Sequence, residues 1–372
     1  MAEKTAGDGG TPEASEPSMV HIHPDELRGF AVRALVAIST PEDIATEVSR
    51  HLVGANLAGH DSHGVLRLPW YVRAGQEGSL NVSARPELVE ESGVCALFDA
   101  HRGFGHYATS IALEWVVARA SEQGLASAAI RDAHHIGRLG DYTERVLERG
   151  LVSIVTVGNA GPASRLTRPF GGAAPFLGTN PWSLGVPGQS HRYMYDAATT
   201  TVAEGKVRVA QSRGTALPDG CIVDRSGRPS SDPEDLYAGG FMLPLGGEVA
   251  GHKGFGLGLG AALFGALSQS DPARPLPEDG SAGGVWMLVL DPGAFGSGDR
   301  YRERVERTLA GVKRTAPVDG GGGVLVPGEP EERNRRNRAA GIPLPEATWQ
   351  DLLSLAESLK IRSPAVAEPG RS

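Results

Sequence analysis

The sequence predicts a layered α/β fold with a flanking helical lobe. Its 372 residues exceed the size of about 250–300 residues at which a single hydrophobic core stops growing. Two helical patterns come first, and between residues 105 and 159 helix, strand, helix and strand then alternate along the chain. That alternation is typical of a layered α/β architecture. We therefore expect more than one structural unit.

The helical lobe is expected at residues 20–85. It follows a leader, residues 1–19, whose small and polar composition predicts disorder and which lacks the basic and apolar segments of a secretory signal. Two helical patterns then meet at the Ser-Thr-Pro sequence of residues 39–41, where a hydroxyl can cap a helix and proline fits a first turn. The second helix reaches Gly59, a residue type common just after helix ends. We expect this lobe to pack with C-terminal helices at 298–360.

The central α/β region, residues 86–297, supplies the predicted sheet. Its first half alternates short strands, helices that stop at glycine, and buried apolar runs. Glycine- and proline-rich residues 171–187 are too irregular for a long element. The expected elements are two strands within 87–100, a helix at 105–124, a strand from 125 into a turn ending at 137, a helix at 138–150 and a strand at 151–159.

The second half is less regular and contains an excursion from the core. The sequence predicts a strand from residue 193 that passes into a helix near 199–209, the turn-rich excursion at 211–250, a glycine-rich approach to an apolar helix within 246–268, and a buried strand at 283–291. Beyond it, amphipathic helices are expected at 300–315 and 348–360, on either side of a glycine run and the basic residues 332–338, with a disordered tail at 361–372.

Composition excludes several classes of function. The net charge of −8 argues against a general nucleic-acid surface. No apolar run approaches the roughly 18–20 residues that span a bilayer, so we expect no membrane insertion. Cys95 and Cys221 are the only cysteines, and they lack a disulfide or zinc-binding spacing. We therefore expect a cytoplasmic protein with two reduced thiols.

Residues 59–67, GHDSHGVLR, place a titratable histidine four residues before a permanent cation. His63 can give or take a proton near neutrality, and Arg67 can hold a carboxylate with two parallel hydrogen bonds. Ser62 and His63 do not indicate a hydrolase dyad, because neighbouring side chains point in different directions. From these residues alone, a proton-transfer site and a merely polar loop both remain open.

Two further clusters also allow two interpretations. His134, His135 and Arg138 lie at a strand-to-helix transition, where a helix N-terminus could bind a phosphate or the imidazoles could simply line a capped turn. The adjacent histidines lack metal-ligand spacing, so we expect no metal site. His252 and Lys253 are expected just before a helix N-terminus, where they could meet a phosphate or a carboxylate.

The spacing of Gly256, Gly258 and Ala261 matches G-x-G-x-x-A, the nucleotide fingerprint. No apolar strand precedes it, and no acid follows at about twenty residues. Close helix packing through small residues is therefore the better interpretation.

Five stretches taken in order resemble the malate/L-lactate dehydrogenase type 2 family of NAD(P)-dependent oxidoreductases. They are GHDSHGVLRLPWYV, HHIGRLGDYTERVLERGLVSIVTVGNAGP, FGGAAPFLGTNPWSLGVP, YDAATTTVAEGKVRVAQSRGTALPDG and GHKGFGLGLGAALFGALS. The resemblance runs from about residue 20 to about residue 360. It implies a mixed-sheet fold that is not the Rossmann fold, NAD or NADP as cofactor, and a homodimer with the cofactor cleft near the subunit contact.

The resemblance also implies roles for individual residues. Ser62 matches the relay serine, His63 the proton donor, Arg67 the substrate-binding arginine and Thr179 a substrate contact. The stretches that match cofactor-binding segments are His135, Ile136, Gly137, Arg138 and Leu139; Asp196, Ala197 and Ala198; His252 and Lys253; and, more weakly, the region from Gly328 to Arg333. Arg138 could also meet the 2′-phosphate of NADP.

One departure bears on the substrate. In the imine-reducing branch of this family an aspartate lies near the position of Lys206, and an arginine stands where this chain has Glu204. Lysine at this possible site resembles the hydroxyacid branch. We therefore expect hydride transfer between the nicotinamide and C2 of a small 2-hydroxy or 2-oxo acid. The alternatives are an NADPH-dependent reductase of a cyclic imine or diketo acid, a metal-dependent hydrolase, and a silent NAD(P)H-binding protein.

Overall fold

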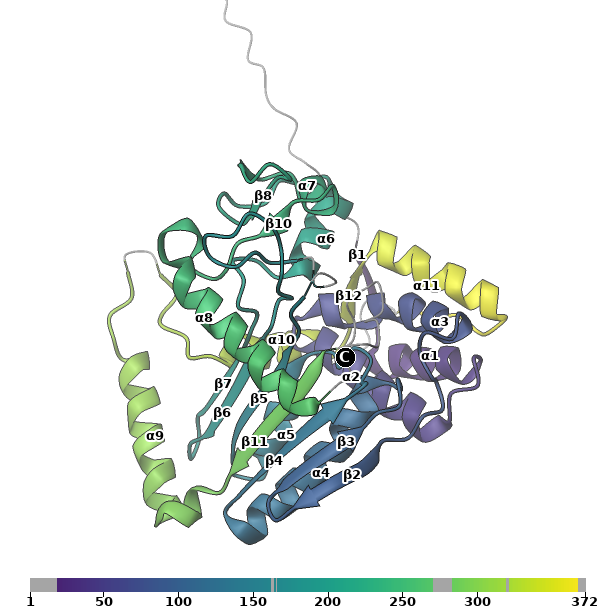
Figure 1. Cartoon of the computed structure of the whole chain (residues 1–372). Helices are drawn as coiled ribbons and strands as arrows, with labels where there is room; N and C mark the ends of the chain where they lie inside the picture. Colours follow the sequence, from purple (N-terminus) through teal and green to yellow (C-terminus); the bar gives the residue numbers. More distant parts are fainter. Residues whose placement is uncertain (1–18, 162–163, 165, 270–282, 319–320, 367–372) are drawn as a thin grey trace, which may run out of the picture.

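The computed structural model describes residues 19–161, 164, 166–269, 283–318 and 321–366 (Figure 1). The predicted leader, apart from Met19, and the end of the predicted tail lie outside these residues. The expected helices and strands of the central region are present in the predicted order. The two halves of the predicted architecture, a helical lobe and a sheet, are both found.

The helical lobe has its own apolar core. Leu27, Phe30, Leu52, Leu68 and Leu352 are fully buried within it. The predicted break at residues 39–41 is confirmed, and Gly59 follows the second helix with a positive φ of 86°. The elements are α1 (Pro24–Val36), α2 (Glu42–Leu57), α3 (Leu68–Gln76) and α11 (Glu346–Leu359), with β1 (Met19–Ile22) paired antiparallel to β12 (Ile342–Pro345).

A seven-stranded mixed sheet forms the centre of the molecule. The strand order is β2-β3-β4-β11-β5-β6-β7, and only the β3–β4 pair is parallel. A Rossmann sheet is mostly parallel, so this topology confirms the expected departure from that fold. The strands are β2 (Glu87–Ser92), β3 (Cys95–Asp99), β4 (Leu125–Arg131), β5 (Val152–Gly158), β6 (Trp182–Pro187), β7 (Arg192–Ala197) and β11 (Gly284–Leu290).

Helices cover both faces of this sheet. Figure 1 shows α8 (Gly247–Gly265) in front of the sheet, with α4 (Gly105–Gln123) and α5 (Leu139–Glu148) behind it. A Cβ at Gly265 would lie 2.7 Å from the carbonyl oxygen of Gly158 and 2.8 Å from that of Gly284. Only glycine permits this approach. Within the G-x-G-x-x-A spacing itself, a Cβ at Gly258 would lie 2.8 Å from Thr199 Oγ1, whereas one at Gly256 would meet nothing within 4 Å, so close packing explains Gly258 and not Gly256.

Helix α8 begins earlier than predicted. Its first residue is Gly247, so His252 and Lys253 lie in the second turn and not before the N-terminus. Both side chains are exposed. The prediction that they stand beside a helix N-terminus is therefore wrong, because the glycine-rich approach is itself helical.

The predicted excursion, residues 211–250, folds together with the preceding helix into one small unit. It contains α6 (Glu204–Arg213), α7 (Pro233–Tyr237) and a three-stranded antiparallel sheet in the order β10-β8-β9, formed by β8 (Ile222–Val223), β9 (Pro229–Ser230) and β10 (Phe241–Met242). Val207, Ile222 and Met242 are buried in its core. Helix α6 begins at Glu204 and not near Thr199, because the N–H of Thr199 donates to Thr179 outside any helix.

Three other elements differ from the expectations. Strand β6 lies within the stretch predicted to be irregular, and the basic stretch forms helix α10 (Glu329–Arg338). Helix α9 (Gly298–Lys313) contacts β6 and β7 at the sheet edge instead of joining the helical lobe. The reason is that the Glu306 carboxylate accepts three backbone N–H groups from the β6–β7 turn, at 2.9–3.1 Å.

No helix in the described part of the chain is long and apolar enough to cross a membrane. Cys95 is exposed and Cys221 is buried, and both are free thiols. Within the same residues, no three His, Cys, Asp or Glu side chains gather in a way that could hold a metal ion.

Candidate active site

Two short 3-10 helices between α2 and α3 carry the residues predicted to be catalytic. They are η1 (Asp61–His63) and η2 (Val65–Arg67). Asn56 of α2 holds this turn from inside, because its Oδ1 accepts the Val65 N–H at 2.9 Å and its Nδ2 donates to Asp61 at 2.7 Å. A Cβ at Gly64 would overlap the Asn56 carboxamide, so glycine is required there.

Ser62 and His63 are hydrogen-bonded to each other. Ser62 Oγ lies 3.0 Å from His63 Nδ1. The expectation that their side chains point apart is wrong, because the tight 3-10 turn folds one residue back onto the next. Within the described residues the other ring nitrogen, Nε2, makes no hydrogen bond. It is therefore available to exchange a proton with a ligand.

The imidazole of His63 is neutral at physiological pH. It stacks on the His135 ring, with centroids 5.6 Å apart and an interplanar angle of 14°. The pKa of His63 is lowered to about 3, first because burial removes water and second because the Arg67 charge is close. Burial and Arg67 also lower the pKa of His135 well below its usual value. Neutral His63 therefore keeps one ring nitrogen without a proton.

Tyr71 fixes the orientation of His135. Its hydroxyl lies 2.7 Å from His135 Nδ1, and the Gly137 N–H donates to the same nitrogen at 3.3 Å. A backbone N–H can only donate, so Nδ1 is an acceptor and the proton of neutral His135 sits on Nε2. Tyr71 is fully buried and was not predicted. The sequence did contain a signal for Tyr71, because His63, Arg67 and Tyr71 follow one another at four-residue spacing.

Arg67 stands as a fixed cation beside His63. Its Nε donates to the carbonyl oxygen of Ser62 at 2.9 Å, and its guanidinium lies 5.6 Å from the centre of the Trp70 ring. Its Nη2 is 3.5 Å from a carboxylate oxygen of Glu204. The arrangement places a positive charge and a proton acceptor side by side, as a 2-hydroxy acid requires.

The start of α6 touches the same turn. A Cβ at Gly205 would lie 2.7 Å from Ser62 Oγ, so the backbones approach too closely for any larger residue. Lys206, predicted as a possible site, is exposed and forms no bond to Ser62, His63 or Arg67 among the described residues. The structure therefore brings Glu204 and not Lys206 to the site.

Three predicted cofactor-binding stretches come together next to His135. Asp196 accepts the Gly140 N–H at 2.6 Å and lies 3.9 Å from Arg138 Nε. Gly328 packs against Met194, two residues before Asp196. Residues from β7, the turn before α5 and the start of α10 therefore form one continuous region.

Of the two interpretations left open for the start of α5, a phosphate site and a capped turn, the described residues form the capped turn. The Asp196 carboxylate already occupies that helix N-terminus. Arg138 is buried and paired with Glu144 at 3.1 Å, so its guanidinium is not presented to a phosphate. Arg138 Nε and Glu331 Oε2 are buried without a hydrogen-bond partner among the described residues. Such polar atoms suit a polar cofactor, and in this respect the region fits one.

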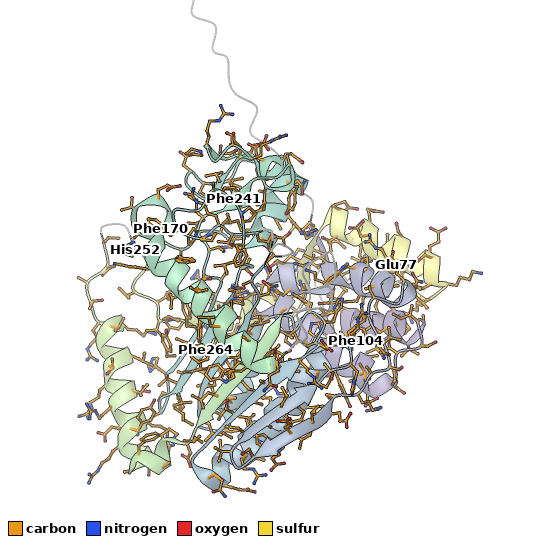
Figure 2. The ribbon with its side chains drawn as sticks, in the orientation of Figure 1. Glu77, Phe104, Phe170, Phe241, His252 and Phe264 are labelled. Atoms are coloured by element: carbon orange, nitrogen blue, oxygen red, sulfur yellow. The ribbon has the colours of Figure 1, made fainter. Side chains whose placement is uncertain are left out.

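Other predicted residues lie apart from this region. The Thr179 carbonyl accepts the Thr199 N–H at 2.9 Å, which ties it to the chain after β7 and not to His63. Figure 2 shows His252 beside Phe170, far from Phe104, and Phe104 packs on Tyr71. The structure does not bring His252, Lys253 or Arg333 into contact with Ser62, His63 or Arg67, and all three are exposed.

His60 and Asp61 had no predicted role, and the structure gives them one. Arg338 of α10 binds the Asp61 carboxylate through both terminal nitrogens, at 2.7 and 3.1 Å. His60 Nε2 lies 3.2 Å from the Glu331 carboxylate on the same helix. These contacts attach the turn that carries Ser62 and His63 to α10, an element that the sequence did not predict.

A family model described as malate/L-lactate dehydrogenase matches residues 22–353. The chain belongs to this family. Hydroxycarboxylate dehydrogenase B of Escherichia coli is 33% identical over 342 residues, which cover 90% of this chain and 92% of that protein.

Two solved structures extend the likeness to the fold. Sulfolactate dehydrogenase from Methanocaldococcus jannaschii superposes with a TM-score of 0.81 at 28% identity, over 92% of this chain and 98% of that one. The δ1-piperideine-2-carboxylate reductase of Pseudomonas syringae superposes with a TM-score of 0.78, also at 28% identity, over 90% and 99%.

Family membership settles the class of protein. It identifies the chain as an oxidoreductase related to dehydrogenases of hydroxy acids, and it implies a nicotinamide cofactor. The metal-dependent hydrolase alternative is thereby overturned. The mixed sheet agrees with the solved malate/L-lactate dehydrogenase relatives and confirms the predicted fold class.

Proposed function

We propose that the protein is an NAD- or NADP-dependent dehydrogenase of a small 2-hydroxy acid, working between the C2 hydroxyl and the C2 ketone. The observation that supports this most directly is the joining of Ser62, His63 and Arg67 on one turn, with His135 stacked on the imidazole. A proton acceptor and a carboxylate-binding cation are the two protein groups that this reaction needs.

The geometry supports one role for each of these residues. His63 Nε2 takes the hydroxyl proton during oxidation and returns it during reduction. Ser62 orients the ring through Nδ1 and takes no part as a nucleophile. Arg67 binds the C1 carboxylate, which fixes the angle of C2; this is a positioning effect. When bound, the nicotinamide supplies the hydride chemistry.

The cofactor is assigned to the region around His135, Asp196 and Gly328. His135 presents an Nε2–H donor beside His63, and Glu331 Oε2 is a buried acceptor without a partner among the described residues. Because the Arg138 guanidinium is bound by Glu144, this residue does not supply a positive charge for a 2′-phosphate.

The deciding experiment is a panel of 2-oxo acids assayed with NADH and with NADPH, followed by loss of nicotinamide absorbance. Turnover of one or more acids is expected. The panel includes piperideine-2-carboxylate, because exclusive turnover of this cyclic imine would favour the alternative reductase. NAD(P)H binding without turnover of any compound would refute the proposal and favour a silent binding protein.

Two variants test the residue roles. His63→Ala should lower kcat by about 10²–10⁴-fold with little change in cofactor affinity. Arg67→Ala should mainly raise KM for the acid. The matched controls are His21→Ala and Arg73→Ala, since both side chains are exposed and lie away from the turn. Normal kinetics in either site variant would refute that residue's role.

The oligomeric state proposed is a homodimer that uses the outer side of α8. Leu257 and Leu263 of this helix are 49% and 64% exposed, and Leu267 of the 3-10 turn that follows it, η3 (Ala266–Ser268), is 51% exposed, which is unusual for large apolar residues so close together. Leu263→Asp should convert a dimer to a monomer in size-exclusion chromatography with light scattering, whereas Phe295→Asp, an exposed apolar control, should not. A monomeric wild type would refute the proposal.

We also propose a cytoplasmic location, in keeping with the two free thiols.

A further inference from the structure

Glu204 places a fixed negative charge beside the predicted carboxylate-binding arginine. Only 13% of its side chain is exposed, and one carboxylate oxygen lies 3.5 Å from Arg67 Nη2. The other oxygen accepts hydrogen bonds from the Tyr237 hydroxyl, at 3.2 Å, and from Arg208 Nε. Three side chains from three elements therefore hold this carboxylate in place.

The charges around the site can be counted one by one. Arg67 and Glu204 form a close pair of opposite sign. Arg208 adds a second positive charge, but its side chain is 56% exposed and its Nε is bonded to Glu204. Lys206 on the same helix is exposed to solvent. On the buried side of the site, the positive charge of Arg67 is therefore already paired with the negative charge of Glu204.

We infer that Glu204 is a specificity-determining residue that selects substrates with a single negative charge, the 2-hydroxy and 2-oxo monocarboxylic acids, over those that carry a second anionic group. This inference rests on the proposed function, since it assumes that Arg67 holds the C1 carboxylate. A substrate with a second carboxylate or a sulfonate brings an extra negative charge within one small molecule's length of Glu204. No second buried cation is present among the described residues of this turn to offset it.

Coulomb's law gives the size of the effect. Like charges about 6–8 Å apart at an effective dielectric constant of about 20–40 repel enough to change an affinity by roughly tenfold or more. Arg208 screens part of the Glu204 charge, so roughly tenfold is the expected discrimination.

The test compares kcat/KM for pyruvate and for oxaloacetate in the full-length enzyme. Wild type should prefer pyruvate, and Glu204→Gln should raise the oxaloacetate-to-pyruvate ratio by roughly tenfold. Glu204→Asp is the matched control, because it keeps the charge and changes the length; its ratio should stay near the wild-type value. Any loss of Arg67 positioning would lower both activities and leave the ratio unchanged.

A near-isosteric pair of inhibitors removes differences in substrate size. Oxamate carries one negative charge and oxalate carries two. Glu204→Gln removes the negative charge and should strengthen inhibition by oxalate relative to oxamate. Arg208→Gln removes the cation bonded to Glu204 and should weaken inhibition by oxalate relative to oxamate. Opposite shifts in the two variants are expected from charge and not from altered folding.

The outcomes separate the two proposals. An enzyme that reduces both acids with a ratio unchanged in Glu204→Gln refutes the role of Glu204 and leaves the proposed function standing. A wild type that prefers oxaloacetate also refutes it. An enzyme that reduces no 2-oxo acid in any variant overturns the proposed function, and this inference with it.

Discussion

Replacing Gly205 with alanine should displace Ser62 and with it the His63 imidazole. The added Cβ would lie 2.7 Å from Ser62 Oγ and closer still to its Cβ. Carbon atoms in contact normally stay about 3.5–4.0 Å apart, and the added Cβ would lie 2.0 Å from Ser62 Cβ, so the turn or the start of α6 has to shift by about 1.5 Å. A shift of that size carries the 3.0 Å bond between Ser62 Oγ and His63 Nδ1 beyond hydrogen-bonding range.

The expected cost is large for activity and modest for stability. A misplacement of about 1 Å at a reacting group lowers the rate by about 10²-fold. We expect Gly205→Ala to reduce kcat by about that factor in steady-state assays with the best 2-oxo acid of the panel, while its thermal unfolding stays cooperative.

Gly311→Ala is the matched control for this substitution. Gly311 lies in helix α9, and a Cβ there would meet nothing within 4 Å. Alanine should therefore leave kcat unchanged and stabilise the helix by up to about 1 kcal/mol. A folded Gly205→Ala enzyme with activity within twofold of wild type would show that the Ser62–His63 geometry is not needed for turnover.

Three further predictions concern the surroundings of the turn. Tyr71→Phe removes a donor to His135 and should lower the free energy of unfolding by about 1 kcal/mol in urea denaturation, with a drop in kcat; unchanged values would contradict the assigned role. Asp61→Asn weakens the two-point contact with Arg338 and should cost about 1 kcal/mol, measured in the same way. Burial holds the pKa of His106 well below its usual value, so the unfolded chain binds a proton that the folded chain does not. His63 and His135 are held neutral in the same way, so each of the three histidines should lower the free energy of unfolding by up to about 1.4 kcal/mol per pH unit as the pH drops below about 6.5; a stability that stays flat between pH 7 and 5 would refute this.

Elements with a clear apolar period could be predicted from the sequence. The buried strands β4, β5 and β11 and the helices α1, α2, α4 and α5 all bury apolar residues at the spacing of their own secondary structure, so local pattern sufficed. Helix α10 could not be found in this way, because none of its residues is buried. Its contacts are ionic, as between Arg335 and Glu144, and such partners lie far away in the sequence.

The residues of the candidate site also divide into those that a local motif places together and those that only the tertiary fold brings close. Ser62, His63 and Arg67 share one short motif, so the sequence could place them together. Glu204 and Asp196 reach the site only through the tertiary fold, and neither could be assigned its contact from local spacing. The burial of Arg138 could not be predicted for the same reason. It depends on an ion pair with Glu144, six residues further along the chain, and Glu144 is itself bound by Arg335 of α10.

The attachment of the turn that carries Ser62 and His63 to α10 sets an order for assembly during synthesis. Asp61 leaves the ribosome early, whereas its partner Arg338 follows 277 residues later. The nascent chain can therefore form the helices around His63 long before the turn receives its last anchor. We therefore expect an incomplete chain that ends before α10 to lack the anchored turn on which the proton transfer proposed for His63 depends.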